Sequence, residues 1–318
     1  MATELLFDSF IISVRAVLPL FFMLLAGVMV KRFKILGDEE LPKINNLVYS
    51  LFLPLLVFSG IYKSDLSNAI DACFILFTLT AVLLVFFAGL LFALLIEKSN
   101  AARGAIIQAI FRSNITIMGI PLVSGIYGGS NLETISVMIA FLAPLYNGLA
   151  VITLETLRST RTSFTKILTG ILKNPLIISG AAGVLFALLD IQLPSVLEKF
   201  ISEMAGVAVP LAIVILGASL KFFGIGGNRR NLIVCVAGRL AVVPGIVLAA
   251  AALLGFRDVE FVTLIAIFAS PCAVSSFTMA QKMDSESELT GNSVAISSVL
   301  ACFTMFFWIL LYKELGIF

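Results

Sequence analysis

The sequence predicts an all-helical protein that crosses a membrane many times. Of its 318 residues, 60% are hydrophobic, and the mean hydropathy is +1.11. Only 13% are charged, whereas about a quarter of the residues of a soluble domain are. Apolar runs recur along the whole chain, and a run of about 20 residues suffices to cross a bilayer as a helix. We therefore expect a polytopic membrane protein with about ten transmembrane helices and no separate soluble domain.

The predicted helices follow one another with short connections. They cover residues 9–30, 44–62, 70–96, 104–127, 133–156, 169–189, 195–220, 230–254, 259–281 and 289–312. The first run is too long for the core of a signal peptide and has no basic segment before it, so we expect it to span the membrane. The longest polar connection, residues 157–168, joins the fifth helix to the sixth at the middle of the chain.

Lysine and arginine residues are distributed unevenly between the two sides of the predicted bundle. One side holds Lys31, Arg32, Lys34, Lys43, Lys98, Arg103, Arg158, Arg161, Lys166, Lys173, Lys221, Arg229, Arg230 and Lys282, and the other holds Lys63, Lys199, Arg257 and Lys313. Positively charged residues concentrate on the cytoplasmic side of membrane proteins. We therefore expect both termini to face outward and the linker at 157–168 to be cytoplasmic.

The fourth predicted helix carries the clearest interruption. Its segment Phe111–Pro121 places an arginine, an asparagine, two hydroxyl groups, a glycine and a proline inside an apolar run. Pro121 has no N–H to give to a helix, and Gly119 lowers the helix propensity further. Non-helical backbone at this depth is tolerated only inside protein or beside a watery cavity. We expect a broken helix; the alternative is a simple proline kink beside a snorkelling Arg112.

The two halves of the chain have interruptions at matching places. The fourth helix is expected to break at 114–121 and the ninth at 269–276. The first half, residues 1–156, and the second half, residues 169–318, each have an odd number of predicted helices, so they lie in opposite orientations. The sequence thus predicts two inverted five-helix repeats, and broken helices at corresponding positions of such repeats indicate a transport site.

Two broken helices that meet in the membrane would offer a binding site for an anion. The N-terminal ends of the half-helices carry unpaired N–H groups and partial positive charge, which suit a carboxylate. The neutral donors and acceptors expected there are Ser113, Asn114, Thr116, Ser270, Ser275 and Ser276, with Asn147 of the fifth helix nearby.

The charged residues inside the predicted helices indicate the sign of the cargo. They are Arg15, Arg112 and Arg239, and no aspartate or glutamate can be placed at mid-depth. Charges in such positions are costly and usually functional. Cations without a deep carboxylate favour an anionic substrate over cation–proton exchange. Arg112 is the main candidate because it precedes the break; Arg15 has the alternative of snorkelling to the outer interface, and Arg239 that of pairing with a cytoplasmic-side glutamate.

Other classes of protein fit the sequence less well. Histidine is absent, and no Gly-x-Ser-x-Gly elbow is present, so we expect no enzyme. The cysteines lie in apolar runs at unrelated spacings, which is typical of small buried residues and not of a disulfide or zinc framework. Basic residues are not interleaved with aromatic ones, so nucleic acid is not an expected partner. Paired breaks without a ring of charges favour a carrier over a channel.

Several segments resemble the auxin efflux carrier family, in order and over nearly the whole chain. They are Ile44–Pro54, Ser113–Leu122 with its Asn-x-x-x-x-Gly-x-Pro pattern, Lys173–Leu176 and Pro210–Leu220. This family includes bacterial malonate and malate permeases and the plant auxin exporters.

The resemblance implies a ten-helix fold shared with bile acid–sodium symporters and sodium–proton antiporters, in which helices four and nine cross at their breaks. One bundle would be a scaffold, and the other would move across a bacterial inner membrane in an elevator-like step, within a homodimer. Carried over from the family, the residues of the two crossing segments are Asn114, Gly119 and Pro121 in the first and Ser270, Pro271 and Ser275 in the second.

The expected function is transport of small organic anions such as malonate, malate or auxin-like acids. The chain has Ile115-Thr116 where family members often have an aromatic residue and a glycine, and it lacks the long cytoplasmic loop of many plant exporters. A small mono- or dicarboxylate is therefore preferred to auxin, and the alternative is a sodium-coupled symporter of a larger, bile acid-like anion. No cofactor is expected. Coupling to Na⁺ or H⁺ stays open, with Ser113, Asn114 and Ser275 as candidate Na⁺ ligands because hard cations accept neutral oxygens.

Overall fold

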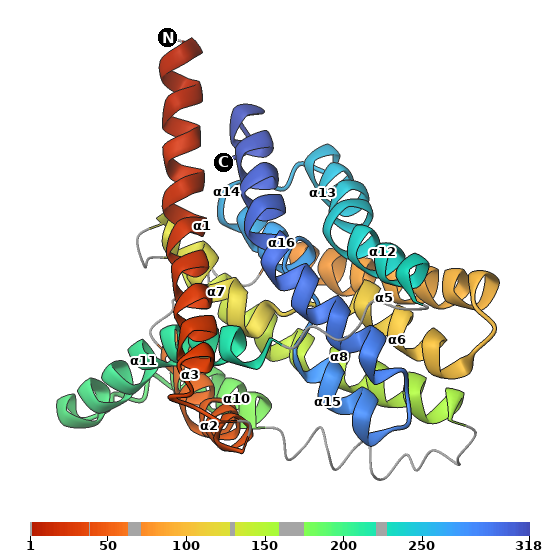
Figure 1. Cartoon of the computed structure of the whole chain (residues 1–318). Helices are drawn as coiled ribbons and strands as arrows, with labels where there is room; N and C mark the ends of the chain where they lie inside the picture. The colour runs from red at the N-terminus through yellow and green to blue at the C-terminus, as the bar shows by residue number, and fades with distance from the viewer. Residues whose placement is uncertain (1, 38, 63–70, 128–130, 159–174, 221–227) are drawn as a thin grey trace.

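The computed structural model describes residues 2–37, 39–62, 71–127, 131–158, 175–220 and 228–318, and helices make up its regular structure there (Figure 1). The helices are α1 (Ala2–Arg32), α2 (Glu40–Leu47), η1 (Val48–Phe52), α3 (Leu53–Tyr62), α5 (Ala72–Ile96), α6 (Asn100–Phe111), α7 (Ile115–Tyr127), α8 (Glu133–Leu157), α10 (Pro175–Leu188), α11 (Ser195–Ser219), α12 (Arg229–Ala237), η2 (Gly238–Val242), α13 (Val243–Leu253), α14 (Asp258–Phe268), α15 (Ser275–Lys282) and α16 (Ser287–Glu314). The chain is thus an all-helical protein in the described ranges.

The observed helices follow the predicted spans closely. The span expected at 195–220, for example, is α11, and the one expected at 133–156 is α8. Within the described residues, six helical stretches are long and apolar enough to cross a membrane: Glu40–Tyr62, Ala72–Ile96, Glu133–Leu157, Ser195–Ser219, Arg229–Leu253 and Ser287–Glu314. The protein is therefore an integral, multi-pass membrane protein. Most of the expected linker at 157–168, and the first residues of the span expected at 169–189, lie outside the described residues.

Two mid-helix prolines are accompanied by π-helical segments, which the sequence analysis did not predict. The π segment η1 ends two residues before Pro54, and η2 ends two residues before Pro244. Proline gives no N–H to the carbonyl four residues back. For Pro244 that carbonyl belongs to Leu240, and it accepts instead a hydrogen bond from the indole Nε1 of Trp308, at 3.0 Å. Single π turns of this kind are frequent at functional sites.

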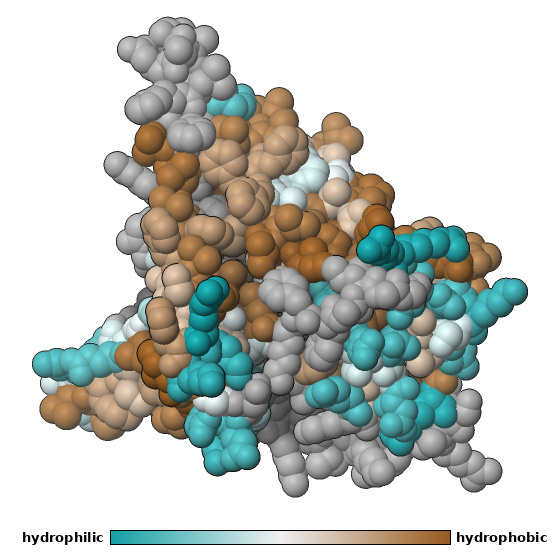
Figure 2. Space-filling model, viewed as in Figure 1, coloured by the Kyte–Doolittle hydropathy of each residue, from teal (hydrophilic) through white to brown (hydrophobic). Residues whose placement is uncertain are grey.

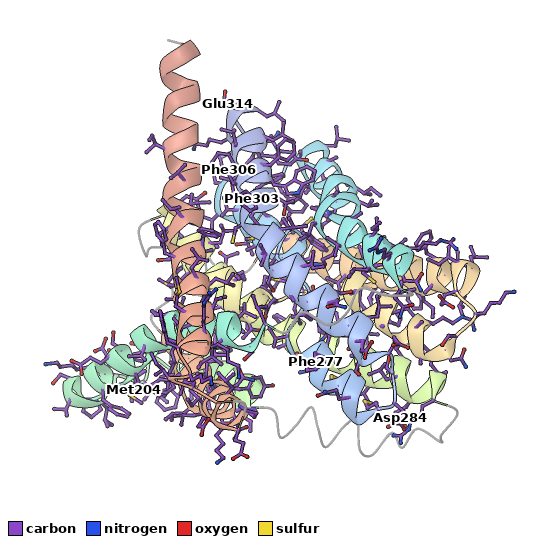
Figure 3. The ribbon with its side chains drawn as sticks, in the orientation of Figure 1. Met204, Phe277, Asp284, Phe303, Phe306 and Glu314 are labelled. Atoms are coloured by element: carbon purple, nitrogen blue, oxygen red, sulfur yellow. The ribbon has the colours of Figure 1, made fainter. Side chains whose placement is uncertain are left out.

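The helices pack in two sets. In the first, α1 packs along α11, and α3 packs against α10 and α11. The second contains α5 to α8 and α12 to α16, with α6 contacting α5, α8 and α12 and with α14 contacting α7 and α13. The sets meet where α1 contacts α7 and α16, and where α3 and α10 contact α8. Phe303 and Phe306 lie on the side of α16 that faces α1 (Figure 3), and the Phe303 ring packs edge-on against Phe21.

Hydrophobic residues dominate the upper and middle parts of the face shown in Figure 2, and hydrophilic residues gather along its lower part. The N-terminal end of α1 and the C-terminal end of α16 lie together at the opposite, upper end (Figure 1). Many of the apolar side chains on the outside of the molecule are large; Leu95, Val196 and Leu253 are examples. Such a surface suits contact with lipid, which is the environment that the composition predicts.

Glycines allow α1 and α11 to approach closely. A Cβ atom on Gly27 would lie 2.0 Å from the carbonyl oxygen of Val214, and one on Gly217 would lie 2.1 Å from that of Leu24. No side chain fits at either position unless the two backbones separate. Small residues permit this kind of contact between membrane helices, where van der Waals packing replaces the hydrophobic driving force.

We expect Gly217→Val to lower the midpoint of thermal unfolding in detergent clearly, because overpacking costs about 1–3 kcal/mol or more when backbone must move. The control is Gly206→Ala on the same helix, where no atom lies within 4 Å of the added Cβ. Alanine is about 1 kcal/mol better than glycine in a helix, so this variant should be neutral or slightly stabilising. Equal midpoints for both variants would contradict the close contact.

Candidate functional site

Two helices are interrupted, and the interruptions lie against each other. α6 ends at Phe111 and α7 begins at Ile115, while α14 ends at Phe268 and α15 begins at Ser275. The N–H of Asn114 donates to the carbonyl of Pro271 at 3.0 Å, and the N–H of Ala273 donates to the carbonyl of Arg112 at 3.2 Å. These bonds make Ser113 and Cys272 an antiparallel β-bridge. Backbone groups in each non-helical segment thus form hydrogen bonds with backbone groups in the other segment.

The first interruption lies earlier than predicted. The sequence analysis located the break at 114–121 and assigned it to Gly119 and Pro121, but both residues lie inside α7. The carbonyl of Asn114 accepts hydrogen bonds from the N–H groups of Ile117 and Met118, so Asn114 starts the helix. Asparagine is favoured at that position. Gly119 has a packing role instead, because a Cβ there would lie 3.1 Å from the side chain of Ile135 on α8.

A cavity of about 100 Å³, with both polar and apolar side chains in its walls, lies beside the two interruptions. Its lining residues are Asn45, Val48, Tyr49, Leu53, Arg112, Ser113, Asn114, Thr116, Ile117, Ala143, Tyr146, Asn147, Ala273, Val274 and Ser275. The predicted site residues among them are Arg112, Ser113, Asn114, Thr116, Asn147 and Ser275. The predicted residues that do not line it are Gly119, Pro121, Ser270, Pro271 and Ser276.

Of the predicted residues that do not line the cavity, two support its walls from behind. The hydroxyl of Ser270 is 2.6 Å from that of Ser113 and is fully buried. Pro271 contributes its carbonyl to the bridge between the segments. Ser276 is also fully buried, and its hydroxyl has no hydrogen-bond partner among the described residues.

Arg112 is a buried cation whose hydrogen-bond partners, among the described residues, are neutral groups. Its guanidinium donates to Asn147 Oδ1 at 2.5 Å, to Met279 Sδ at 2.8 Å and to Gln108 Oε1 at 3.3 Å. The residue is 3% exposed, and no carboxylate contacts it within the described part of the chain. A buried charge without a counter-ion is costly. The side chain therefore presents an uncompensated positive charge at the wall of the cavity.

Two helix ends add partial positive charge to the same cavity. α7 and α15 both begin at it, and Thr116 and Ser275 from their first turns line it. The first N–H groups of a helix have no partners within the helix and attract anions. In addition, the side-chain nitrogen of Asn114 is buried and has no hydrogen-bond partner among the described residues. An acceptor in the cavity would satisfy these donors.

Arg239 proves to be a structural cation outside the cavity. A cytoplasmic-side glutamate was the alternative partner expected for this residue, but its partners among the described residues are backbone carbonyls. The guanidinium donates to backbone carbonyls, at 2.7 Å to those of Ser270 and Ile267 and at 3.2 Å to that of Ile110. The side chain of Arg15, the third predicted intramembrane cation, lies outside the described residues.

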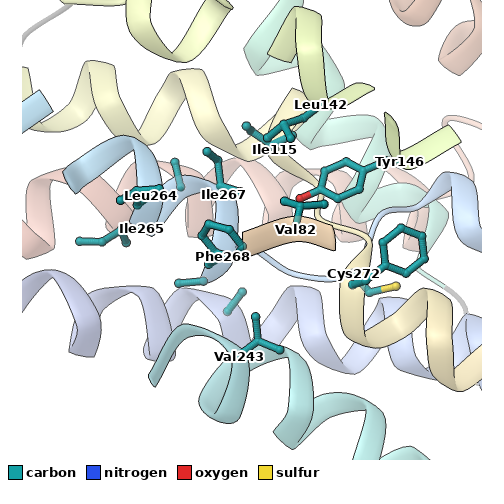
Figure 4. Packing of buried hydrophobic residues seen from close by; sticks show 14 of the residues in the cluster. Val82, Ile115, Leu142, Tyr146, Val243, Leu264, Ile265, Ile267, Phe268 and Cys272 are labelled. Atoms are coloured by element: carbon teal, nitrogen blue, oxygen red, sulfur yellow. The ribbon is translucent and has the colours of Figure 1, made fainter. Parts of the chain in front are cut away.

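The sequence analysis missed three polar residues of the cavity. Asn45 and Tyr49 come from α2 and η1, and Tyr146 comes from α8 beside Asn147. Asn45 and Tyr49 are four residues apart, which places them on one helix face, and this spacing in an apolar span could have identified them. Figure 4 shows Tyr146 and Ile115 among the buried apolar side chains around the interruptions, where the Tyr146 ring packs against Phe111.

A multi-pass helical protein in which a cavity with polar side chains lies beside paired helix interruptions has the architecture of a membrane transporter. The sequence model of the family described as "Membrane transport protein" matches residues 12–157 and 151–309 of the chain. The chain therefore belongs to this family, and the resemblance to the auxin efflux carriers is confirmed.

Similar proteins are also transporters by name. The chain is 23% identical over 305 residues to an "Uncharacterized transporter" of Methanothermobacter thermautotrophicus, covering 93% of this chain and 97% of that protein. It is 24% identical over 297 residues to a "Putative malonate transporter" of Rhizobium meliloti, covering 91% and 92% of the two chains. The similarity in both cases extends over nearly the full length.

Proposed function

We propose that this chain is a secondary carrier of small organic anions, with mono- and dicarboxylates such as malonate as the substrate class. The observation that carries the proposal is the uncompensated Arg112 at the wall of the cavity. A carboxylate there would pair with the guanidinium and accept hydrogen bonds from the N-terminal ends of α7 and α15. Binding would thereby offset the cost of burying the cation.

The size of the cavity favours a small anion. Sites for drug-sized ligands usually measure about 300–1,000 Å³, whereas this one measures about 100 Å³. The alternative, a sodium-coupled symporter of a larger bile acid-like anion, fits this cavity poorly. The name of the Rhizobium relative also supports a dicarboxylate, since it refers to malonate.

The proposed mechanism is alternating access by an elevator-like movement within a ten-helix inverted repeat. Support comes from the cavity walls. Asn45 and Tyr49 lie on α2 and η1, which contact α11 of the first helix set, whereas Asn147 and Ser275 lie on helices of the second set and Arg112 lies between two of its helices. Displacement of one set against the other would open the cavity to one side of the membrane and then to the other. In this proposal the crossed helices are α6–α7 and α14–α15.

The proposed environment is a cytoplasmic membrane, in which the protein is a homodimer with both termini outside. The common location of the two termini in Figure 1 and the asymmetry of lysine and arginine support this orientation. The family resemblance supports the dimer. Coupling to Na⁺ would use Ser113, Asn114 and Ser275, which line the same cavity; without it, the membrane potential drives the anion outward.

Uptake into proteoliposomes tests cargo and coupling together. Labelled malonate, malate, lactate and indole acetate are offered with and without a sodium gradient and with and without a pH gradient. We expect saturable uptake of at least one small carboxylate, competed by the unlabelled compound. Failure of all four anions together with detectable Na⁺/H⁺ exchange would contradict the proposal.

A further inference from the structure

Arg239 ties two interrupted helices together at a point outside the cavity. It lies in the π segment η2, is 1% exposed and does not line the cavity. Its Nε donates to the carbonyl of Ser270 and its Nη2 to that of Ile267, both at 2.7 Å. Its Nη1 donates to the carbonyl of Ile110 at 3.2 Å and more distantly to that of Phe111. One side chain therefore contacts the C-terminal ends of both α6 and α14.

The chemistry of these partners suits a guanidinium. The last carbonyls of a helix have no partners within the helix and carry partial negative charge. A guanidinium offers five N–H donors in a rigid planar fork, whereas an ammonium has three donors around a point. Arg239 thus neutralises two helix ends at once and fixes the distance between them.

We infer that Arg239 is a positioning residue for the transport site. The inference rests on the proposed function, because it concerns the geometry of the same site. α6 leads directly to Arg112 and Asn114, and α14 leads through residues 269–274 to Ser275. By holding the ends of α6 and α14 together, Arg239 sets where Arg112 lies relative to the N-terminal ends of α7 and α15. It also makes the two interruptions move as one unit.

A disulfide can report this geometry without any substrate. The hydrogen bonds from Asn114 to Pro271 and from Ala273 to Arg112 flank Ser113 and Cys272, so these two residues form a non-hydrogen-bonded antiparallel pair. The Cα atoms of such pairs are about 4.5 Å apart, which a disulfide can bridge. Ser113→Cys should therefore form a disulfide with Cys272 on mild oxidation, as long as the two segments keep their places.

The test combines Ser113→Cys with Arg239→Lys, with Arg239→Gln, or with the control Arg257→Gln. Arg257 also donates to backbone carbonyls, those of Ala252 and Phe256, but it is exposed and outside the cavity. The rate of disulfide formation is followed by peptide mass spectrometry. The malonate Kd is measured by titration calorimetry in the same Arg239 and Arg257 variants with native Ser113.

We expect both Arg239 variants to slow disulfide formation at least about tenfold and to raise the malonate Kd by a similar factor, since a displacement of about 1 Å costs up to about 100-fold at a preorganised site. Arg239→Lys should change the disulfide rate and the malonate Kd less than Arg239→Gln does, and Arg257→Gln should leave both unchanged. If Arg239→Gln does not fold, Arg239→Lys decides. Unchanged disulfide rates and an unchanged Kd in a folded Arg239 variant would overturn the inference. If malonate does not bind the parent protein, the proposed function fails, but the disulfide rates still decide whether Arg239 positions the segments.

Discussion

Arg112→Gln is expected to weaken the binding of a small carboxylate by about 30-fold or more. Removing one partner of a buried charge pair costs about 2–5 kcal/mol, and about 1.4 kcal/mol corresponds to a factor of ten in Kd. Uptake into proteoliposomes should fall accordingly at substrate concentrations below the wild-type Kd. The measurement is the malonate Kd by titration calorimetry.

The stability of the unliganded protein separates a binding role of Arg112 from a structural one. Its partners, Asn147, Met279 and Gln108, are neutral. Replacing the cation by a neutral amide removes an uncompensated buried charge. We therefore expect the midpoint of thermal unfolding without substrate to stay the same or to rise, and the stabilisation by malonate to disappear. Arg257→Gln is the matched control, in which both the midpoint without substrate and the stabilisation by malonate should be unchanged. A lower unfolding midpoint with an unchanged malonate Kd in Arg112→Gln would show that Arg112 has a structural role instead of a binding role.

Asn114→Ala is expected to abolish most transport while the fold persists. Its structural contributions come from the backbone, whose N–H bonds to Pro271 and whose carbonyl bonds to Ile117 and Met118. Alanine keeps these bonds and removes only the amide, whose nitrogen has no hydrogen-bond partner among the residues that the structure describes. A hydrogen bond to a charged group contributes about 1.5–3 kcal/mol, so we expect the Kd for malonate to rise about tenfold or more.

Asn114→Asp sharpens the same test, because it keeps the shape of the side chain and adds a negative charge that repels an anion. We expect a larger loss of affinity than with alanine. Asn46→Ala is the control, since Asn46 is exposed and, in the part of the chain that the structure describes, its amide oxygen accepts a bond from Ser50 of η1. Normal uptake by both Asn114 variants would show that the Asn114 side chain does not take part in substrate binding.

Most membrane spans could be predicted well because they are long apolar runs, and the span expected at 195–220 differs from α11 by a single residue. The exact position of the first break could not be predicted. Gly119 and Pro121 contributed to the break expected at 114–121. The effects of a proline on a helix are local, however: a missing hydrogen bond and a clash with the carbonyl four residues back. Pro54 and Pro244 both follow a π segment, η1 or η2, inside a longer helical stretch. The backbone actually leaves the helix at residues 112–114, where a second chain segment offers it replacement bonds. That segment, residues 271–273, is remote in sequence from residues 112–114, so no local pattern points to it.

Some residues of the cavity could likewise be predicted from the sequence, and others could not. Arg112, Asn114 and Asn147 could be identified because polar groups in an apolar run are exceptional. Asn45 and Tyr49 were missed because they lie on a different helix and reach the cavity only through the packing of α2 and η1 against it. The role of Arg239 could not be predicted either, because its partners are backbone carbonyls of two other helices, which no side-chain pattern reveals.

The most direct test of the account is an experimental structure of the protein with malonate bound, by electron cryo-microscopy in lipid nanodiscs. The account predicts density for the anion between the Arg112 guanidinium and the first turns of α7 and α15, with a carboxylate oxygen within hydrogen-bonding distance of Arg112 and Asn114. Density for the anion elsewhere, or continuous helices through residues 112–114 and 269–274, would contradict it.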